Sequence, residues 1–336
     1  MKLSILDQSP VIRGHTPAQA VNETIKLAQA ADELGYSRYW LAEHHALQAL
    51  GDPCPEILVT RVAAATSRIR VGTGGILLPY YSPFKVAEQF RMLEALFPQR
   101  IDLGIGRAPG GDQTTAMAMG GGRYPSAENF PEQVQYLVAY LDDAMPAGHP
   151  FAKVKAQPMG DTSPEVWLLG SSDYSGALAS ELGLRFAFAH FISAEGGDQV
   201  MRDYKRKFQP SAREADAHAL LAVFVICAET DEEAERRAKS INLRRLNMDY
   251  GINSPVPDVA EAEARELNEA ERQRVAYHRR RVVYGSPDTV KAGLIALAER
   301  FDADELMVIT ITGDYRTRLE SYRLLAEAFD LGRKSY

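Results

Sequence analysis

The chain has 336 residues, of which 46% are hydrophobic, and its formal net charge is -7. This allows a large core, while the acidic balance and the lack of any basic block longer than residues 279–281 argue against nucleic acid. No apolar run is long enough to span a membrane. Asp7 and Gln8 interrupt the apolar core that a signal peptide needs, and Cys54 and Cys227 lack metal-binding spacing. We therefore expect a reduced, cytoplasmic protein that binds neither nucleic acid nor a membrane.

Strand and helix patterns alternate along the first third of the chain. Residues 3–6 have a strand pattern, and Thr16 and Pro17 then suit the start of a helix that Gly35 ends. The bulky residues 39–41 belong to a second strand that leads directly into His44 and His45. We expect further strands over 69–78 and 101–106, and helices over 56–66 and 83–97.

The alternation continues with longer interruptions. Residues 108–124 are rich in glycine and too long for a simple βα loop, which indicates a binding loop. The charged segment 251–283 fits no single αβ unit, and we interpret it as an insertion that acts as a lid. We expect strands over 166–169, 186–189, 220–227 and 305–311, and helices over 127–143, 171–183, 195–208, from 230 onward, 286–300 and 315–329.

Eight strands that alternate with helices predict an α/β fold, a (β/α)8 TIM barrel with insertions, in one domain over residues 1–336. Ligands of such barrels bind beyond the carboxyl ends of the strands. Glu43, His44 and His45 lie at such an end, where a histidine suits a general base, although packed, hydrogen-bonded residues are an equal alternative. A metal site is disfavoured because consecutive strand residues point opposite ways and no second His/Cys cluster exists.

Glycines interrupt two of the expected strands. Gly72–Gly75 marks either a simple bulge or a close approach of the backbone to a planar ligand, through a strained or cis peptide. Gly104–Gly110 has the spacing Gly-x-Gly-x-x-x-Gly, which is a weak dinucleotide signal because Pro109 prevents an immediate helix. Arg107 lies at a strand end, where it is either a phosphate ligand or a surface arginine.

The segment Gly170–Ser175 joins a strand to a helix through small, hydroxyl-rich residues. Helix N-termini bind anions well, although an ordinary Ser/Asp cap is the commoner explanation. Asp173 would repel an anion if it pointed inward, so we expect it to point away. Together with Arg107, the segment favours a phosphate-bearing cofactor in the mouth of the barrel.

These segments together resemble the bacterial luciferase-like (LLM class), flavin-dependent monooxygenase and oxidoreductase family, in its non-luminescent single-chain form. Leu41–His45, Val71–Pro79, Ala87–Gln89 and Arg100–Gly110 carry the resemblance in the family's order and spacing. Residues 166–172, 186–191 and 285–290 extend it over nearly the whole chain. The resemblance implies a (β/α)8 barrel that binds FMN at the carboxyl ends of its strands.

The resemblance also implies roles for single residues. Gly74–Gly75 matches a non-proline cis peptide that lies against the isoalloxazine, and His44 matches the histidine used for acid–base work near the flavin. Arg107 matches the phosphate-binding arginine, and Arg123 is a second, loosely aligned candidate. Gly106 replaces a reactive cysteine of many luciferases, which argues against light emission but not against flavin binding. The phosphate loop matches Gly170, Ser171, Ser172 and Tyr174.

The implied mechanism has two components. A separate NAD(P)H:flavin reductase supplies reduced FMN, which reacts with O2 to give a flavin C4a-peroxide that oxygenates a small organic substrate such as a carbonyl compound. Residues 251–283 occupy a region where family members have a mobile loop, so we expect this lid to close over reduced flavin. Family dimers pack through early helices, so we expect a homodimer, with residues 83–97 as a candidate face and core packing as the alternative.

Three alternative hypotheses remain open from the sequence. An F420-dependent oxidoreductase would share the barrel, although the sequence has no added basic patch for the anionic tail of F420. A non-catalytic FMN-binding protein would store or carry the cofactor. Without the resemblance, a sugar-phosphate lyase or isomerase would need a strand-end lysine or paired carboxylates, whereas Lys2 and Lys85 lie at strand and helix starts.

Overall fold

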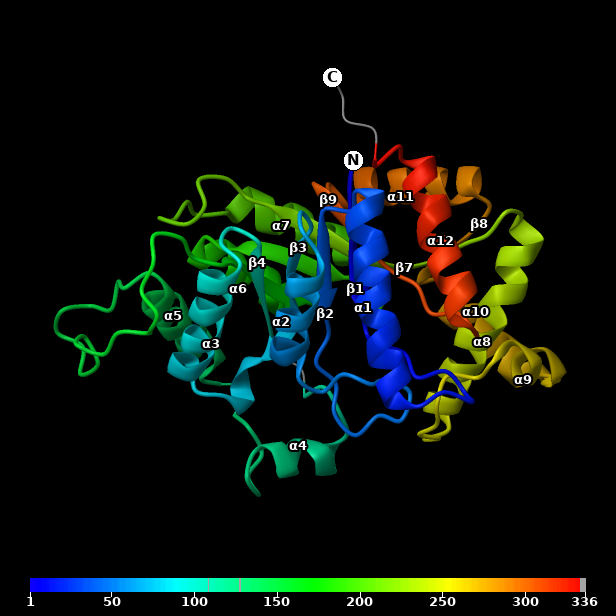
Figure 1. Ribbon diagram of the computed structural model, residues 1–336, viewed down its shortest axis with the longest axis horizontal. Coiled ribbons are helices and arrows are strands. Elements are labelled where there is room, and N and C mark those ends of the chain that lie inside the picture. The colour runs from blue at the N-terminus through cyan, green and yellow to red at the C-terminus, as the bar shows by residue number, and fades with distance from the viewer. Residues whose placement is uncertain (108, 127, 333–336) are drawn as a thin grey trace.

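The computed structural model describes residues 1–107, 109–126 and 128–332. Its centre is a parallel sheet in which eight strands close into a barrel surrounded by helices (Figure 1). The predicted (β/α)8 TIM barrel is therefore confirmed. In ring order the strands are β1 (Lys2–Asp7), β2 (Arg38–Leu41), β3 (Arg70–Leu77), β4 (Ile101–Gly106), β5 (Glu165–Gly170), β6 (Arg185–Ala189), β7 (Ala219–Cys227) and β9 (Glu305–Ile309), which pairs again with β1.

A ninth short strand, β8 (Val282–Gly285), pairs in parallel with residues 224–227 of β7. It lies outside the closed ring, because β6 and β9 flank the earlier part of β7. The sequence pattern does not predict this strand, and its first two residues belong to the insertion expected over residues 251–283. Three of its four residues are only half-buried, so no buried apolar run marks it in the sequence.

The helices begin and end at the expected caps. Thr16 and Gln19 form a capping box at the start of the first helix, and Gly35 ends that helix with a φ of 89°. The helices around the barrel are α1 (Pro17–Leu34), α2 (Pro55–Ala65), α3 (Pro83–Leu96), α5 (Phe130–Leu141), α6 (Asp173–Leu182), α7 (Gly197–Lys207), α8 (Asp231–Asp249), α11 (Pro287–Phe301) and α12 (Tyr315–Ala328), with a 3-10 turn, η1 (Leu78–Tyr80), before α3.

Three further helices lie in the long interruptions. The glycine-rich segment contains α4 (Gln113–Met119), which was not predicted, and the insertion contains α9 (Val259–Ala264) and α10 (Glu269–Arg279). Figure 1 shows α4 and α9 at the lower edge of the molecule, beyond the carboxyl ends of the strands. The insertion helices pack against α8, so the insertion is a folded part of the molecule.

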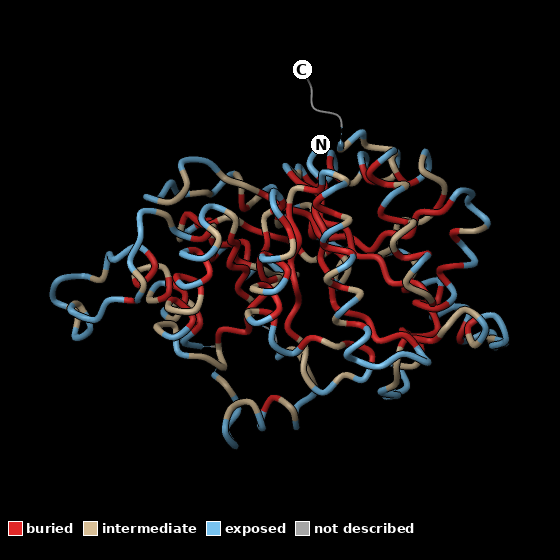
Figure 2. The backbone as a smooth tube through the Cα atoms, in the orientation of Figure 1, coloured by how far each residue is buried: buried red, intermediate tan, exposed pale blue. Residues whose placement is uncertain are grey.

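Buried residues concentrate on the strands and on the helix faces that meet them (Figure 2). Among the described residues, no helix is long and apolar enough to cross a membrane. Within the same residues, no group of three or more His, Cys, Asp or Glu side chains could hold a metal ion. Cys54 and Cys227 are both free thiols.

A buried arginine closes the amino end of the barrel. Arg38 is the first residue of β2 and is 4% exposed. Its guanidinium lies 2.9 Å from Asp102 of β4 and 2.7 Å from Glu165 of β5. It also lies 3.1 Å from Glu305 of β9. One side chain therefore joins the starts of four strands.

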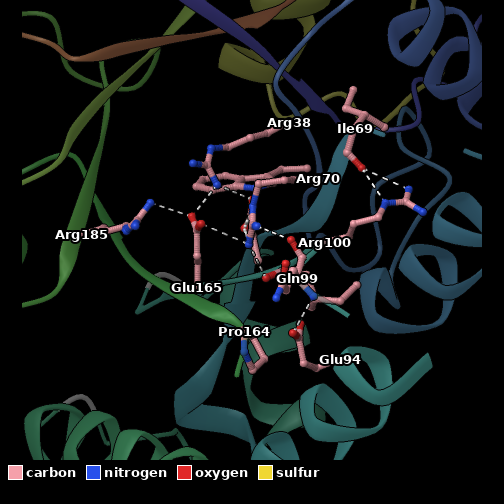
Figure 3. A network of polar contacts seen from close by, with 12 residues as sticks. Arg38, Ile69, Arg70, Glu94, Gln99, Arg100, Pro164, Glu165 and Arg185 are labelled. Atoms are coloured by element: carbon pink, nitrogen blue, oxygen red, sulfur yellow. Dashed lines mark hydrogen bonds and ion pairs between the residues drawn. The ribbon is translucent and has the colours of Figure 1, made fainter. Parts of the chain in front are cut away.

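Two more arginines extend this layer. Arg70 contacts Asp102 at 2.7 Å, and Arg185 contacts Glu165 at 2.6 Å. Figure 3 shows Arg38, Arg70 and Arg185 converging on Glu165. Burial alone would raise the pKa of Asp102, but the charges of Arg38 and Arg70 outweigh burial and hold that pKa below its ordinary value. Asp102 therefore stays ionised and paired at neutral pH.

Replacing Arg38 with methionine should destabilise the protein, because the change leaves the carboxylates of Asp102 and Glu305 buried without their partner. We expect Arg38→Met to lower the free energy of unfolding by about 3–5 kcal/mol, measured by urea denaturation. The control is Arg206→Met, which removes an ion pair whose arginine side chain is 69% exposed and should cost at most about 1 kcal/mol. Equal losses in the two variants would contradict the role of the buried layer.

Candidate active site

A cavity of about 240 Å³ lies inside the barrel, toward the carboxyl ends of the strands. Leu6, Trp40, Leu169 and Met307 supply part of its apolar wall. The indole Nε1 of Trp40 donates to Asp102 at 2.8 Å, so Trp40 separates the cavity from the ion-pair layer. The cavity is therefore closed on the amino side and opens where (β/α)8 barrels bind ligands.

The structure brings nearly all of the predicted site residues to this cavity. Its lining includes His44, Gly74, Gly75, Arg107, Gly170, Ser171 and Ser172. Tyr174 is not part of the lining, but its ring lies 4.2 Å from the guanidinium carbon of Arg107. Arg123 is exposed and outside the lining, and His190, at the end of β6, is buried outside it.

Glycine is required where β3 passes the cavity. The peptide bond between Gly74 and Gly75 is cis, as the resemblance implied. The pairing of β3 with β4 is irregular between Thr73 and Ile76, so the predicted bulge is also present. A Cβ on Gly75 would lie 2.6 Å from the carbonyl oxygen of Gly104, which no side chain tolerates. The backbone therefore forms a flat stretch of cavity wall without side chains.

His44 lies in the loop that follows β2, not on the strand itself. Its Nδ1 is buried and has no hydrogen-bond partner among the described residues. Burial, together with the charges of Arg244 and His45, lowers the pKa of His44 to about 4. The imidazole is therefore neutral at physiological pH, and its buried nitrogen can exchange a hydrogen bond or a proton with a ligand in the cavity.

Glu43 also lines the cavity, and it fixes this loop in place. Its carboxylate accepts hydrogen bonds from the Tyr81 hydroxyl at 2.6 Å and the Leu77 amide at 2.9 Å, and it contacts His45 Nε2 at 2.8 Å. The two histidines consequently have different surroundings, since His45 binds Glu43 while His44 faces the cavity. A metal site that uses both histidines is not formed.

The residues expected to bind an anion lie together at the ends of β4 and β5. Arg107 is exposed and forms no ion pair with any described residue. The hydroxyls of Ser171 and Ser172 also have no hydrogen-bond partner within the described chain, and Ser172 does not cap α6 with its side chain. Asp173 is exposed and accepts the Tyr174 amide, outside the cavity lining, which agrees with the expectation that it points away.

Three polar residues of the lining were not chosen as site residues. Gln8 directly follows β1, and Glu43 lies just beyond β2, so the strand-end rule that singled out His44 applies to both. Ser175 is 4% exposed and reaches the cavity from the first turn of α6. The sequence predicts that Ser175 lies on a helix, but it does not indicate which side of α6 faces the cavity.

Comparisons with known proteins agree with this geometry. Residues 1–304 match the family model described as luciferase-like monooxygenase. N-acetyl-S-alkylcysteine monooxygenase of Bacillus subtilis (strain 168) is 36% identical over 331 residues, covering 98% of each chain.

Solved structures are similar too. The crystal structure of apo-MsnO8 has a TM-score of 0.91 and 42% identity, and covers 99% of this chain and 98% of that one. The oxygenating constituent of 3,6-diketocamphane monooxygenase from Pseudomonas putida, in complex with FMN, shares the fold with a TM-score of 0.70, 20% identity, and coverage of 98% and 97%. The extent of the family match, together with these relatives, shows that the chain belongs to the luciferase-like monooxygenase family.

Proposed function

We propose that the protein is the oxygenating component of a two-component, FMN-dependent monooxygenase. A separate NAD(P)H:flavin reductase would supply reduced FMN, and one atom of O2 would enter a small organic substrate. The bound flavin would supply the oxygen chemistry, while the protein positions it and excludes water. The N-acetyl-S-alkylcysteines, named for one relative, are the first substrate class to test.

The observation that carries this proposal is that unpaired polar groups converge on one cavity. The side chains of Arg107, Ser171 and Ser172 form no hydrogen bond or ion pair within the described chain, so their donors are available to a phosphate group. The side-chain-free wall at Gly74 and Gly75 suits a planar ring. The residues present therefore fit a flavin mononucleotide, with its phosphate at the ends of β4 and β5 and its ring beside β3.

His44 is the proposed acid–base residue. It lines the cavity, it is neutral at physiological pH, and its buried Nδ1 has no partner among the described residues. A neutral imidazole can accept a proton from one substrate atom and return it to another. The hydrogen bonds of Glu43 hold the loop that carries it.

Two alternatives keep some support. F420 remains a candidate cofactor because the fold is shared with an F420-dependent secondary alcohol dehydrogenase at a TM-score of 0.69. A non-catalytic FMN carrier would use the same phosphate groups but would not need His44. A sugar-phosphate lyase or isomerase is disfavoured, since the described lining contains no lysine and Glu43 is its sole carboxylate, already bonded to three groups.

We expect reduced FMN to bind in an anaerobic titration and Arg107→Met to weaken this binding at least about tenfold, since a charged hydrogen bond is worth about 1.5–3 kcal/mol. His44→Asn should keep the affinity but slow substrate oxidation by about 10²–10⁴-fold. Arg123→Met is the matched control, because Arg123 lies outside the cavity lining.

Different outcomes point to different alternatives. If F420 binds and neither oxidised nor reduced FMN does, the reaction is a hydride transfer and not an oxygenation. Full substrate turnover in His44→Asn would contradict the role of His44. If the protein binds FMN but shows no oxygen-dependent chemistry, the non-catalytic FMN carrier would be the correct alternative.

We also propose that residues 251–283 act as a lid over reduced flavin. The beginning of this segment is hydrogen-bonded to the loops after β1 and β2, which contribute Gln8, Glu43 and His44 to the cavity lining. The Asn253 side chain accepts the Gln48 amide and donates to the Ala46 carbonyl, each at 2.8 Å. Val256 exchanges backbone hydrogen bonds with Val11 and Arg13, each at 2.8 Å. Motion of the segment would therefore displace the loop that carries His44.

Loosening this contact should uncouple oxygen consumption. We expect Asn253→Ala to release hydrogen peroxide from enzyme-bound reduced FMN several-fold faster in aerated buffer, because water reaches the flavin more readily. Arg272→Ala is the control, since Arg272 is on α10 and its side chain hydrogen-bonds, within the described chain, only to Glu269 and the Leu267 carbonyl. Equal release rates in the wild type and Asn253→Ala would contradict the lid.

A homodimer is proposed through the groove between α2 and α3. Ile57, Met92 and Leu96 are exposed there by 68%, 52% and 55%. Charges of both signs border these residues, including Arg61 and Glu88, so the surface can complement a second copy of itself. Exposed apolar residues that lie together in this way are typical of an interface.

Placing a charge in this groove should weaken the dimer. We expect Met92→Glu to raise the dimer dissociation constant at least about tenfold, because a carboxylate would be buried against its symmetry mate. Light scattering after size-exclusion chromatography measures the mass. Met248→Glu, at a methionine that is 54% exposed on α8, is the matched control. A monomeric wild type, or an unchanged mass for Met92→Glu, would contradict this interface.

A further inference from the structure

A cluster of three arginines lies at the carboxyl end of the barrel, on the β7 side. Arg244 and Arg245 are adjacent on α8 and are each 8% exposed. Arg281 precedes β8 and is half-buried. Burial lowers the pKa of both Arg244 and Arg245 to about 10, so both remain charged at neutral pH. The cluster therefore places three positive charges where little water reaches.

No carboxylate among the described residues pairs with this cluster. The side chain of Arg244 forms no hydrogen bond with the described chain, and its Nε is buried there without a partner. The side chain of Arg245 donates to the His278 carbonyl at 3.3 Å, and its guanidinium carbon lies 4.6 Å from the centre of the Phe224 ring. Arg281 donates to the Ile192 carbonyl at 2.7 Å and contacts His278 Nδ1 at 2.8 Å.

Acids on α8 and α10 pair with other residues. Asp249 contacts Arg274 at 2.7 Å and His278 at 2.6 Å. Glu271 contacts Arg265 at 2.6 Å. Buried charges without partners destabilise a fold, so a cluster of this kind is best explained by an anion that binds there.

Each arginine of the cluster is connected to the cavity wall. The charge of Arg244 acts on His44, which lines the cavity. Arg245 lies over Phe224, whose ring packs 5.7 Å from that of Phe191 in the cavity lining. Arg281 holds the carbonyl of Ile192, which also belongs to the lining.

The cluster is distinct from the proposed phosphate site. Arg107 directly follows β4, whereas the guanidinium of Arg245, the neighbour of Arg244, lies over the ring of Phe224 on β7, three strands further around a ring of eight. That separation places the two positive regions nearly across the barrel from each other. A flavin phosphate held by Arg107 therefore leaves the second region for another anion.

We propose that Arg244, assisted by Arg245 and Arg281, binds a carboxylate of the substrate on the β7 side of the cavity. This rests on the proposed function, because it names the substrate class of the same cavity. A guanidinium binds a carboxylate through two parallel hydrogen bonds, which also orients the molecule. Such a substrate would place its uncharged part toward His44 and the ring site.

The test compares two probes of equal length, hexanoate and hexanamide, by isothermal titration calorimetry on the full chain. We expect hexanoate to bind at least about tenfold more tightly, a difference of about 1.4 kcal/mol. Arg244→Met should abolish that preference and Arg244→Lys should retain part of it, because lysine keeps the charge but not the planar fork. Arg202→Met, at an exposed ion pair with Asp198 on α7, should keep the preference in full.

Thermal unfolding provides a readout that a purely structural arginine would not give. Arg244→Met should raise the melting temperature by a few degrees, because it removes a buried charge and leaves no carboxylate unpaired. Hexanoate should raise the melting temperature of the wild type but not that of Arg244→Met.

Three results would each overturn the proposal. The first is an equal affinity for hexanoate and hexanamide, and the second is a preference for hexanoate that persists in Arg244→Met. The third is that Arg244→Met loses binding of reduced FMN or F420 while its binding of hexanoate is unchanged. Arg107→Met separates this inference from the proposed function. If FMN fails to bind but the preference for hexanoate depends on Arg244, the flavin proposal fails and the anion site stands.

Discussion

The ion pairs of Arg38 with Asp102, Glu165 and Glu305 fix the amino end of the barrel. The interior of an eight-stranded barrel must be filled by side chains, and here its first layer is charged. Such a layer is stable only when every partner is present, because an unpaired buried charge costs several kcal/mol. The ring of Trp40 packs 5.4 Å from that of Trp167 beside this layer. The cavity of about 240 Å³ accordingly lies in the carboxyl half of the barrel.

The two ends of the barrel differ in whether their buried polar groups have partners. At the amino end the buried charges have partners, and the pKa of Asp102 is held low by them. At the carboxyl end several polar groups lack partners among the residues that the structure describes, including His44 Nδ1 and Arg244 Nε. Unpaired groups of this kind lower stability, and they are expected where a ligand completes the hydrogen bonds. The proposed flavin and carboxylate sites are therefore two parts of one incompletely paired region.

The insertion connects these parts. Its first residues are bonded to the loops after β1 and β2 through Val256 and Asn253. Its last residues include His278 and Arg281, which contact each other, and Arg281 also donates to the Ile192 carbonyl in the cavity wall. A carboxylate bound by the arginine cluster would therefore contact the segment that is proposed to cover the flavin. Substrate binding and closure would then be coupled through shared contacts.

The sequence by itself determined the alternation of strands and helices, the close backbone approach at Gly74–Gly75 and the strand-end position of His44 and Arg107, because each depends on local patterns and on the rule that ligands bind at strand ends. It did not reveal α4 or β8, whose short segments carry no long apolar period. Only the tertiary structure decided the partners of Arg38, which lie 64, 127 and 267 residues away, and the approach of Arg244 to His44. The physical reason is that these contacts depend on how the strands close into a ring, and no local pattern encodes that closure.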